Sequence, residues 1–273
     1  MDPLKLPLRI GCGLAIAGAL FAFQKPFHQY PGVEYFQFEV PPYQDHTEFA
    51  FARLMFPPGP LDGYYPRFQG DWRKGLSLWT QDYPRADRHF SLALKRLTRL
   101  DVRGVEQPVM LEDGDEAFNW PWLYAVQVGE WGLTEQEAKI LREYLDRGGF
   151  FMADDFHGID EYNEFVKRIG FVFPDRPLVD IPDNDPIFHT VYDLDDKFQI
   201  PGQAHLRLGY KNNGIGAHWR GIYDDKGRLM VAASYNSDIG DAWEYADDPY
   251  YPEKFSGLAI RIGVNYVMYA MTH

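Results

Sequence analysis

The chain has 273 residues, a formal net charge of −13, and a hydrophobic fraction of 45%. This length and apolar content suffice for one large α/β domain, while the acidic charge without a basic stripe argues against nucleic acid as a partner. The only cysteine is Cys12, which excludes an internal disulfide and leaves the remainder of the chain without thiol chemistry.

The first 23 residues have the pattern of an export signal. Lys5 and Arg9 precede an uncharged apolar run from Ile10 to Phe23, which is shorter than the roughly 20 residues that span a bilayer comfortably. We therefore expect residues 1–23 to form a cleaved signal peptide or a retained membrane anchor, with a buried N-terminal helix as the alternative. The protein would then be periplasmic or anchored in the cell envelope, and would meet the membrane only through this segment.

Residues 24–47 contain four prolines among aromatic residues and predict an irregular segment that leads into a domain over residues 48–273. Apolar runs predict strands at residues 48–55, 105–111 and 122–128, and Pro108 favours a sheet edge for the second. Apolar side chains at helical spacing predict a helix over residues 85–100. Thr134 and Glu137 have the spacing of a capping box, which predicts that another helix begins there.

The next stretch organises the whole domain. Gly148 and Gly149 end the preceding helix, and residues 150–153 are apolar without alternation, as in a parallel strand covered on both faces. Asp154, Asp155 and His157 follow at once, so we expect a polar loop at the carboxyl end of a central strand. Ligands of open α/β sheets bind at this edge, and the sequence therefore predicts a site here.

The remaining elements complete a mainly parallel α/β sheet. Helical spacing predicts helices at residues 159–170 and 255–271. Apolar runs at residues 217–223 and 228–235 predict two strands joined by a hairpin turn. Residues 236–248 are expected to form a polar loop. A strand, a helix and a second strand within residues 122–153 predict a right-handed parallel crossover.

Four separate motifs in this chain carry a resemblance to a known family. They are Tyr144-Leu145-x-x-Gly148-Gly149-Phe150-Phe151-x-Ala153-Asp154-Asp155, Asp185-Pro186-Ile187-Phe188-His189, Asn236-Ser237-Asp238-Ile239-Gly240-x-x-Trp243-Glu244, and Arg261-Ile262-Gly263-Val264-Asn265-Tyr266. Over about residues 48–273 the chain resembles the bacterial domain-of-unknown-function family numbered 4159. The resemblance implies the fold of class I glutamine amidotransferases and trehalose-utilisation-type proteins, a flavodoxin-like three-layer sandwich. It also implies an envelope location, but no established activity.

Glutamine amidotransferase chemistry needs a cysteine nucleophile on the turn that follows a central strand. The equivalent residues here, 153–157, contain neither cysteine nor serine. We therefore exclude glutamine hydrolysis by a thiol.

The polar cluster allows several kinds of site. Asp154, Asp155 and His157 offer oxygen and nitrogen ligands to a divalent cation, which would activate water for hydrolysis. His189, Asp238 and Glu244 are further candidates for ligand binding from neighbouring loops. Alternatively, Asp155 is a carboxylate nucleophile or general base, which makes Asp155 and His157 the candidate catalytic residues.

A structural interpretation stands beside these. Asp154 can cap the helix that begins near Ile159, and Asp155 can bind loop amides. Trp131 can stack on a sugar or belong to the core. We expect an exported domain that binds a small polar ligand or cation in an acidic pocket formed by loops after Val128, Ala153 and Tyr235. The alternatives are a non-catalytic interaction module that binds an envelope protein and a metal-dependent hydrolase.

Overall fold

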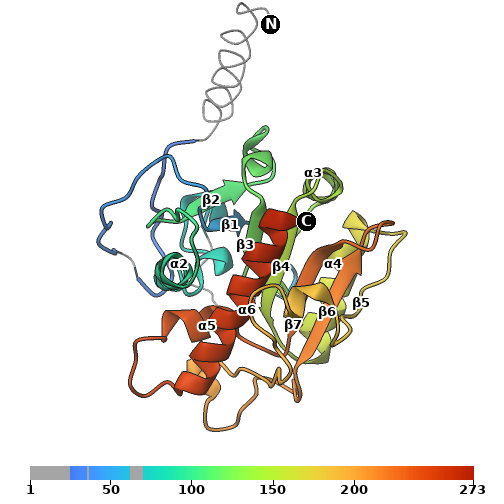
Figure 1. Cartoon of the computed structure of the whole chain (residues 1–273). Coiled ribbons are helices and arrows are strands. Elements are labelled where there is room, and N and C mark those ends of the chain that lie inside the picture. The colour runs from blue at the N-terminus through green and yellow to red at the C-terminus, as the bar shows by residue number, and fades with distance from the viewer. Residues whose placement is uncertain (1–24, 36, 62–69) are drawn as a thin grey trace, which may run out of the picture.

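A seven-stranded sheet forms the centre of the computed structural model, which describes residues 25–35, 37–61 and 70–273 (Figure 1). The strands are β1 (Ala52–Met55), β2 (Gln107–Met110), β3 (Trp122–Ala125), β4 (Phe150–Phe156), β5 (Val179–Asp180), β6 (His218–Tyr223) and β7 (Leu229–Tyr235). Their spatial order is β2-β1-β3-β4-β7-β6-β5. The first five in this order run parallel, whereas β6 and β5 pair antiparallel at one edge. The prediction of a mainly parallel α/β sheet is confirmed.

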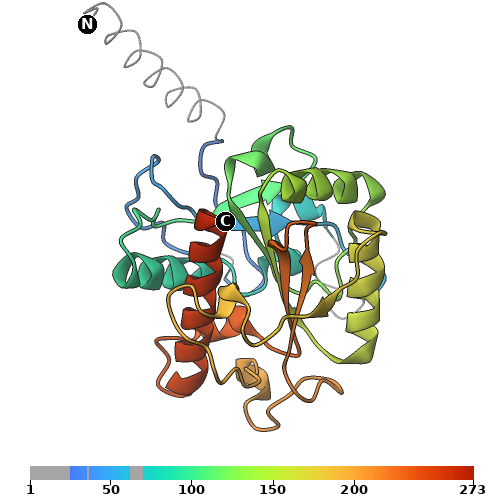
Figure 2. The same ribbon diagram turned by 45° about the vertical axis from the view of Figure 1, so that its right-hand side comes forward.

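Helices cover both faces of this sheet. They are α2 (Arg85–Leu97), α3 (Glu135–Asp146), α4 (Gly158–Val172), α5 (Ile239–Glu244) and α6 (Glu253–Thr272). Side chains of α3 and α4 share one hydrophobic core with the sheet, and those of α2, α5 and α6 share a second. Figure 2 shows α6, in red, and α4, in yellow-green, on opposite sides of the strands. None of the helices in the described residues has the length and apolar character needed to cross a membrane.

The central strand β4 explains why its sequence lacks alternation. Phe151 and Ala153 pack in the core beneath α3 and α4, while Phe150 and Met152 pack in the core beneath α2 and α6. Because successive side chains of a strand point to opposite faces, both sets must be apolar when helices cover both faces. The predicted buried parallel strand is confirmed.

Two local signals gave correct element positions. Thr134 and Glu137 form a reciprocal capping box, in which the Glu137 amide donates to Thr134 Oγ1 at 3.1 Å and the Thr134 amide donates to Glu137 Oε2 at 2.8 Å. Pro108 lies in β2, which is an outer strand of the sheet. An edge strand tolerates proline because one side of its backbone needs no ladder partner.

Two predicted loops are wrong. Asp154 and Asp155 lie within β4 itself, because this strand continues to Phe156, where it pairs with Tyr235 of β7 after a register shift. The short helix α5 occupies the middle of residues 236–248, which the polar composition had predicted to be a loop. The expectation for residues 1–23 lies outside the described residues. Residues 25–35 and 37–48 contain no helix or strand.

The turn from β4 into α4 requires glycine at position 158, where φ is +75°. A Cβ atom at this position would lie 2.1 Å from Asn213 Oδ1. We expect Gly158→Ala to lower the free energy of unfolding by about 1–3 kcal/mol, measured by urea denaturation, because the backbone is strained for any other residue and the added methyl clashes.

Gly170 in the last turn of the same helix provides the matched control. A Cβ atom there meets nothing within 4 Å, and its φ is not positive. Gly170→Ala should stabilise the domain by up to about 1 kcal/mol through helix propensity. Equal effects of the two substitutions would contradict the assigned turn geometry.

Candidate functional site

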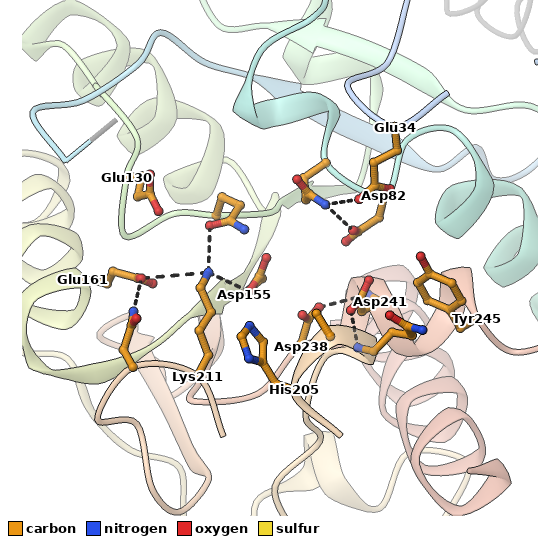
Figure 3. Close-up of a pocket in the computed structure, with 15 residues that line it drawn as sticks. Glu34, Asp82, Glu130, Asp155, Glu161, His205, Lys211, Asp238, Asp241 and Tyr245 are labelled. Carbon is orange, nitrogen blue, oxygen red and sulfur yellow. Dashed lines mark hydrogen bonds and ion pairs between the residues drawn. The ribbon is translucent and has the colours of Figure 1, made fainter. Parts of the chain in front are cut away.

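A cavity of about 360 Å³ opens at the carboxyl ends of β3, β4 and β7 (Figure 3). The described residues that line it include seven carboxylates but a single lysine. The carboxylates are Glu34, Asp82, Glu130, Asp155, Glu161, Asp238 and Asp241, and the lysine is Lys211. The cavity is therefore strongly acidic, and it lies at the sheet edge where α/β proteins bind their ligands.

Asp155 lies at the centre of the site in an unusual backbone conformation, with φ at +51°. Its Oδ1 is 2.8 Å from His157 Nε2 and 3.8 Å from Lys211 Nζ. Burial alone would raise the pKa of Asp155, but the positive charge of Lys211 and the hydrogen bond from His157 outweigh it and lower the pKa below its usual value. Asp155 is thus held as an ionised carboxylate, on a strained backbone of the kind that clusters at functional sites.

Asp154, the preceding residue, has a different role. Its carboxylate accepts hydrogen bonds from the hydroxyls of Tyr124 and Ser234 and from the amides of Ile239 and Gly240. It therefore ties together β3, β4, β7 and the start of α5. The expectation that Asp154 caps the helix near Ile159 is wrong, because its acceptors are all directed to α5 and to the neighbouring strands.

His157 supports Asp155 from just outside the cavity. Its ring Nε2–H donates to the ionised carboxylate of Asp155, and its backbone amide donates to Glu161 Oε2 at 2.6 Å. Its Nδ1 is buried and has no hydrogen-bond partner among the described residues. Asp155, His157 and Asp238 each offer one ligand atom within 4.8 Å of the others, whereas the predicted partner Asp154 is not in this group.

Lys211 is the basic counterpart of the cluster. Its Nζ lies 3.8 Å from Asp155 Oδ1, 3.9 Å from Glu161 Oε1 and 3.4 Å from Gln127 Oε1. Although burial lowers the pKa of Lys211, the surrounding carboxylates, Asp155 first, raise it above its usual value. Lys211 therefore stays charged and neutralises one side of the cavity.

The opposite side of the cavity has no comparable compensation in the described residues. Burial raises the pKa of Asp82 and Asp238 well above the ordinary value, and neighbouring carboxylates add to the effect. Burial likewise raises the pKa of Asp241 to about 7 and that of Glu244 to about 9, with Glu34 and other carboxylates contributing. At neutral pH this side of the site retains protons unless a cation replaces them.

These raised pKa values predict a pH-dependent stability. An unfolded carboxyl group loses its proton near pH 4, whereas folded Asp241 and Glu244 keep theirs to about pH 7 and 9. The folded state therefore binds more protons in this interval, and stability is lost as the pH rises. In buffers without divalent cations, the thermal unfolding midpoint should decrease as the pH is raised from about 5 to about 9. Glu244→Gln should flatten this slope, and a midpoint that rises steadily to pH 9 would contradict the assignment.

The remaining predicted site residues lie outside the cavity. His189 Nδ1 is 2.8 Å from Asp193 Oδ1, and its Nε2 faces the carbonyl of Asp183, so His189 organises its own loop. Trp131 is fully buried and stacks on Phe151 with the two rings 6° from parallel, which matches the core alternative. Glu244 is buried behind the cavity, beside Glu34.

Several lining residues carried no recognisable signal in the sequence. His205 ends the short 3-10 helix Gln203–His205, and Lys211 lies in the segment after it, which has no periodic pattern. Asp82 precedes α2 in a Gln-Asp-Tyr-Pro segment, whose pattern predicts only the start of a helix. Glu34 comes from the irregular lead-in. The fold brings these segments together from distant parts of the chain.

These features define the class of protein: an α/β domain with an acidic cavity at the carboxyl edge of its sheet. The model of the family described as domain of unknown function (DUF4159) matches residues 73–271, and the chain belongs to this family. A segment of 130 residues is 28% identical to Sialidase B of Streptococcus pneumoniae serotype 4, and it covers 46% of this chain and 16% of that protein. The chain therefore corresponds to less than a fifth of this curated relative.

Proposed function

We propose that this domain binds a small polar ligand with positive charge, or a cation, in the acidic cavity. The observation that carries the proposal is the charge imbalance: seven carboxylates and one lysine line a single cavity of about 360 Å³. Buried carboxylates of like charge repel one another and are costly to ionise. A bound cation lowers this cost, while an anion would increase it.

Asp155 is the proposed recognition group at the centre of this cavity. It is the carboxylate that Lys211 and His157 keep ionised, and it is buried with a side chain of fixed orientation. A fixed, charged acceptor costs little further ordering when a ligand arrives. The ammonium, hydroxyl or metal group of a ligand would therefore meet a preorganised partner.

Metal-dependent hydrolysis is the second candidate function. It is favoured by the pair of Asp155 and His157, whose Oδ1 and Nε2 atoms lie 2.8 Å apart at the end of the central strand. A carboxylate held by histidine can act as a general base toward water. We do not extend sialidase activity to this chain, because sialic acid carries a carboxylate that the acidic cavity would repel.

The three-layer arrangement of the fold and the export of the protein are also proposals. The two helix groups, each packed on its own core, support a three-layer flavodoxin-like sandwich related to class I glutamine amidotransferases and trehalose-utilisation-type proteins. The basic and apolar residues 1–23 support export to the periplasm or cell envelope. A non-catalytic module that binds an envelope protein is the alternative to a ligand-binding role. None of these roles involves thiol chemistry.

Thermal unfolding of the EDTA-treated full-length chain tests the proposed function. The panel should contain divalent cations, a polyamine and an amino sugar, with glucose and sulfate as neutral and anionic controls. A ligand at about 100 times its Kd should raise the midpoint by about 5–10 °C, because it binds only the folded state. Asp155→Asn should abolish the shift caused by an organic cation, since Asp155 is the proposed recognition group for such a ligand.

The controls separate the possible outcomes. Asn keeps the size of Asp155, so the variant should unfold close to the wild-type midpoint when no ligand is present. A shift that sulfate reproduces would show a non-specific salt effect. If no cationic compound moves the wild-type midpoint, the ligand-binding proposal fails, and the interaction module becomes the preferred function.

A further inference from the structure

Three carboxylates converge on the side of the cavity away from Lys211. Asp82 lies just before α2, while Asp238 and Asp241 belong to the start of α5. One oxygen from each lies within 4.8 Å of the other two, and Figure 3 shows the three side chains directed toward one another. The separation is compatible with three oxygens bound to one ion, since calcium holds its oxygen ligands at about 2.3–2.6 Å.

Asp82 supplies an independent indication that a ligand belongs here. Its side chain is 1% exposed, and its Oδ2 has no hydrogen-bond partner among the described residues. A buried carboxylate oxygen that lacks a donor is costly. This oxygen lies beside Gly240 at the start of α5, and a cation bound among the three acids would supply the missing partner.

The same carboxylates lie close to the backbone at two glycines. A Cβ at Gly202 would lie 2.4 Å from Asp238 Oδ2 and 2.7 Å from Asp241 Oδ2, and one at Gly240 would lie 2.4 Å from Asp82 Oδ2. The backbone thus approaches the three acids closely. Any larger residue at either position would displace an oxygen of the group.

One alternative ligand group, which consists of Asp155, His157 and Asp238, is less suitable. His157 Nε2 is already engaged with Asp155 Oδ1 at 2.8 Å, and Lys211 Nζ lies 3.8 Å from the same oxygen. A metal bound there would have to displace the hydrogen bond and would face a fixed positive charge. Asp82, Asp238 and Asp241 form no ion pair with a described residue. The hydrogen bonds to them come from the amides of Asp241 and Gln203 and from the Gln81 side chain, and none of these donors carries a positive charge.

We propose that Asp82, Asp238 and Asp241 form a binding site for a hard divalent cation, with calcium as the preferred ion. Carboxylate oxygens are the ligands that calcium prefers, and waters in the cavity would complete its six to eight positions. The inference deepens the proposed function and rests on it, since it names the cation and the residues. Asp155 and Lys211 remain beside the ion to contact a polar ligand.

Isothermal titration calorimetry of the EDTA-treated full-length chain with CaCl₂ tests this site. We expect one bound calcium ion per chain and weaker binding of MgCl₂, because magnesium surrenders its waters reluctantly. Asp82→Asn should weaken calcium binding by about tenfold or more, since it removes a charged ligand from a site with few of them. Asp241→Asn is the second variant, in case the buried Asp82 position fails to tolerate substitution.

Glu161→Gln is the matched control, because Glu161 lines the same cavity but lies beside Lys211 rather than beside the three acids. It makes the same change from carboxylate to amide and should change calcium affinity by less than about threefold. Equal losses in Asp82→Asn and Glu161→Gln would overturn the assigned ligands in favour of diffuse attraction. Absence of calcium binding, together with a midpoint rise for an organic cation, would overturn this inference and leave the proposed function intact.

Discussion

Asp87→Asn is expected to lower the free energy of unfolding by about 3–5 kcal/mol, the largest stability loss that we predict. Arg53 of β1 and Asp87 of α2 form an ion pair whose side chains are both 0% exposed. Arg53 Nε lies 2.9 Å from Asp87 Oδ2, and its Nη1 donates to the carbonyls of Trp79 and Gln81. Removing the carboxylate leaves a guanidinium charge buried without its counter-ion. Urea denaturation of the full-length chain measures the loss.

The exposed pair of Arg142 and Asp175 provides the control, because its atoms are also close, at 2.6 Å, but its side chains are 32% and 52% exposed. Asp175→Asn should leave the unfolding midpoint unchanged, since water screens such pairs. The double variant Arg53→Met with Asp87→Leu should recover most of the loss by replacing both charges with apolar groups. A neutral effect of Asp87→Asn alone would contradict the importance of this pair.

Asp154→Ala is expected to cost about 2–4 kcal/mol of stability, because it leaves several buried donors without an acceptor. The carboxylate accepts from the amides of Ile239 and Gly240 at 3.0 and 2.8 Å and from the Tyr124 hydroxyl at 2.8 Å. Its loss should loosen the start of α5. Hydrogen exchange at residues 239–244 should accelerate accordingly, as measured by mass spectrometry.

Asp154→Asn is the conservative comparison. The asparagine oxygen can still accept from the two amides while its amide group turns toward Ser234, so we expect less than about half of the alanine loss. Asp155→Asn, one residue further along the strand, should lower stability by less than about 1 kcal/mol. If Asp154→Ala unfolds like the wild type, Asp154 does not hold α5.

The main elements of the fold could be predicted because their signals are local. The continuous apolar run of residues 150–153 indicates a strand that is buried on two faces. The spacing of Thr134 and Glu137 indicates the start of α3. The helix α5 could not be predicted in this way. It has six residues, and the carboxylate of Asp154 from another strand binds its first amides. Short helices depend on such tertiary contacts more than on their own propensity.

The candidate site was predictable only in part. Asp155 and Asp238 were expected near the carboxyl ends of strands and do line the cavity. Lys211, which neutralises Asp155, comes from a loop with no periodic pattern, and its role depends on the folded path of that loop. Trp131 illustrates the reverse case, because composition alone does not distinguish a core aromatic residue stacked on Phe151 from one that faces a ligand.

A crystal structure of the full-length chain, grown with the cation or cationic compound that raises the unfolding midpoint most, tests the proposed binding site most directly. We expect electron density for this ligand inside the cavity, within bonding or hydrogen-bonding distance of Asp155 or of the three carboxylates Asp82, Asp238 and Asp241. Density confined to another surface, with the cavity holding only water, would contradict the proposed binding site.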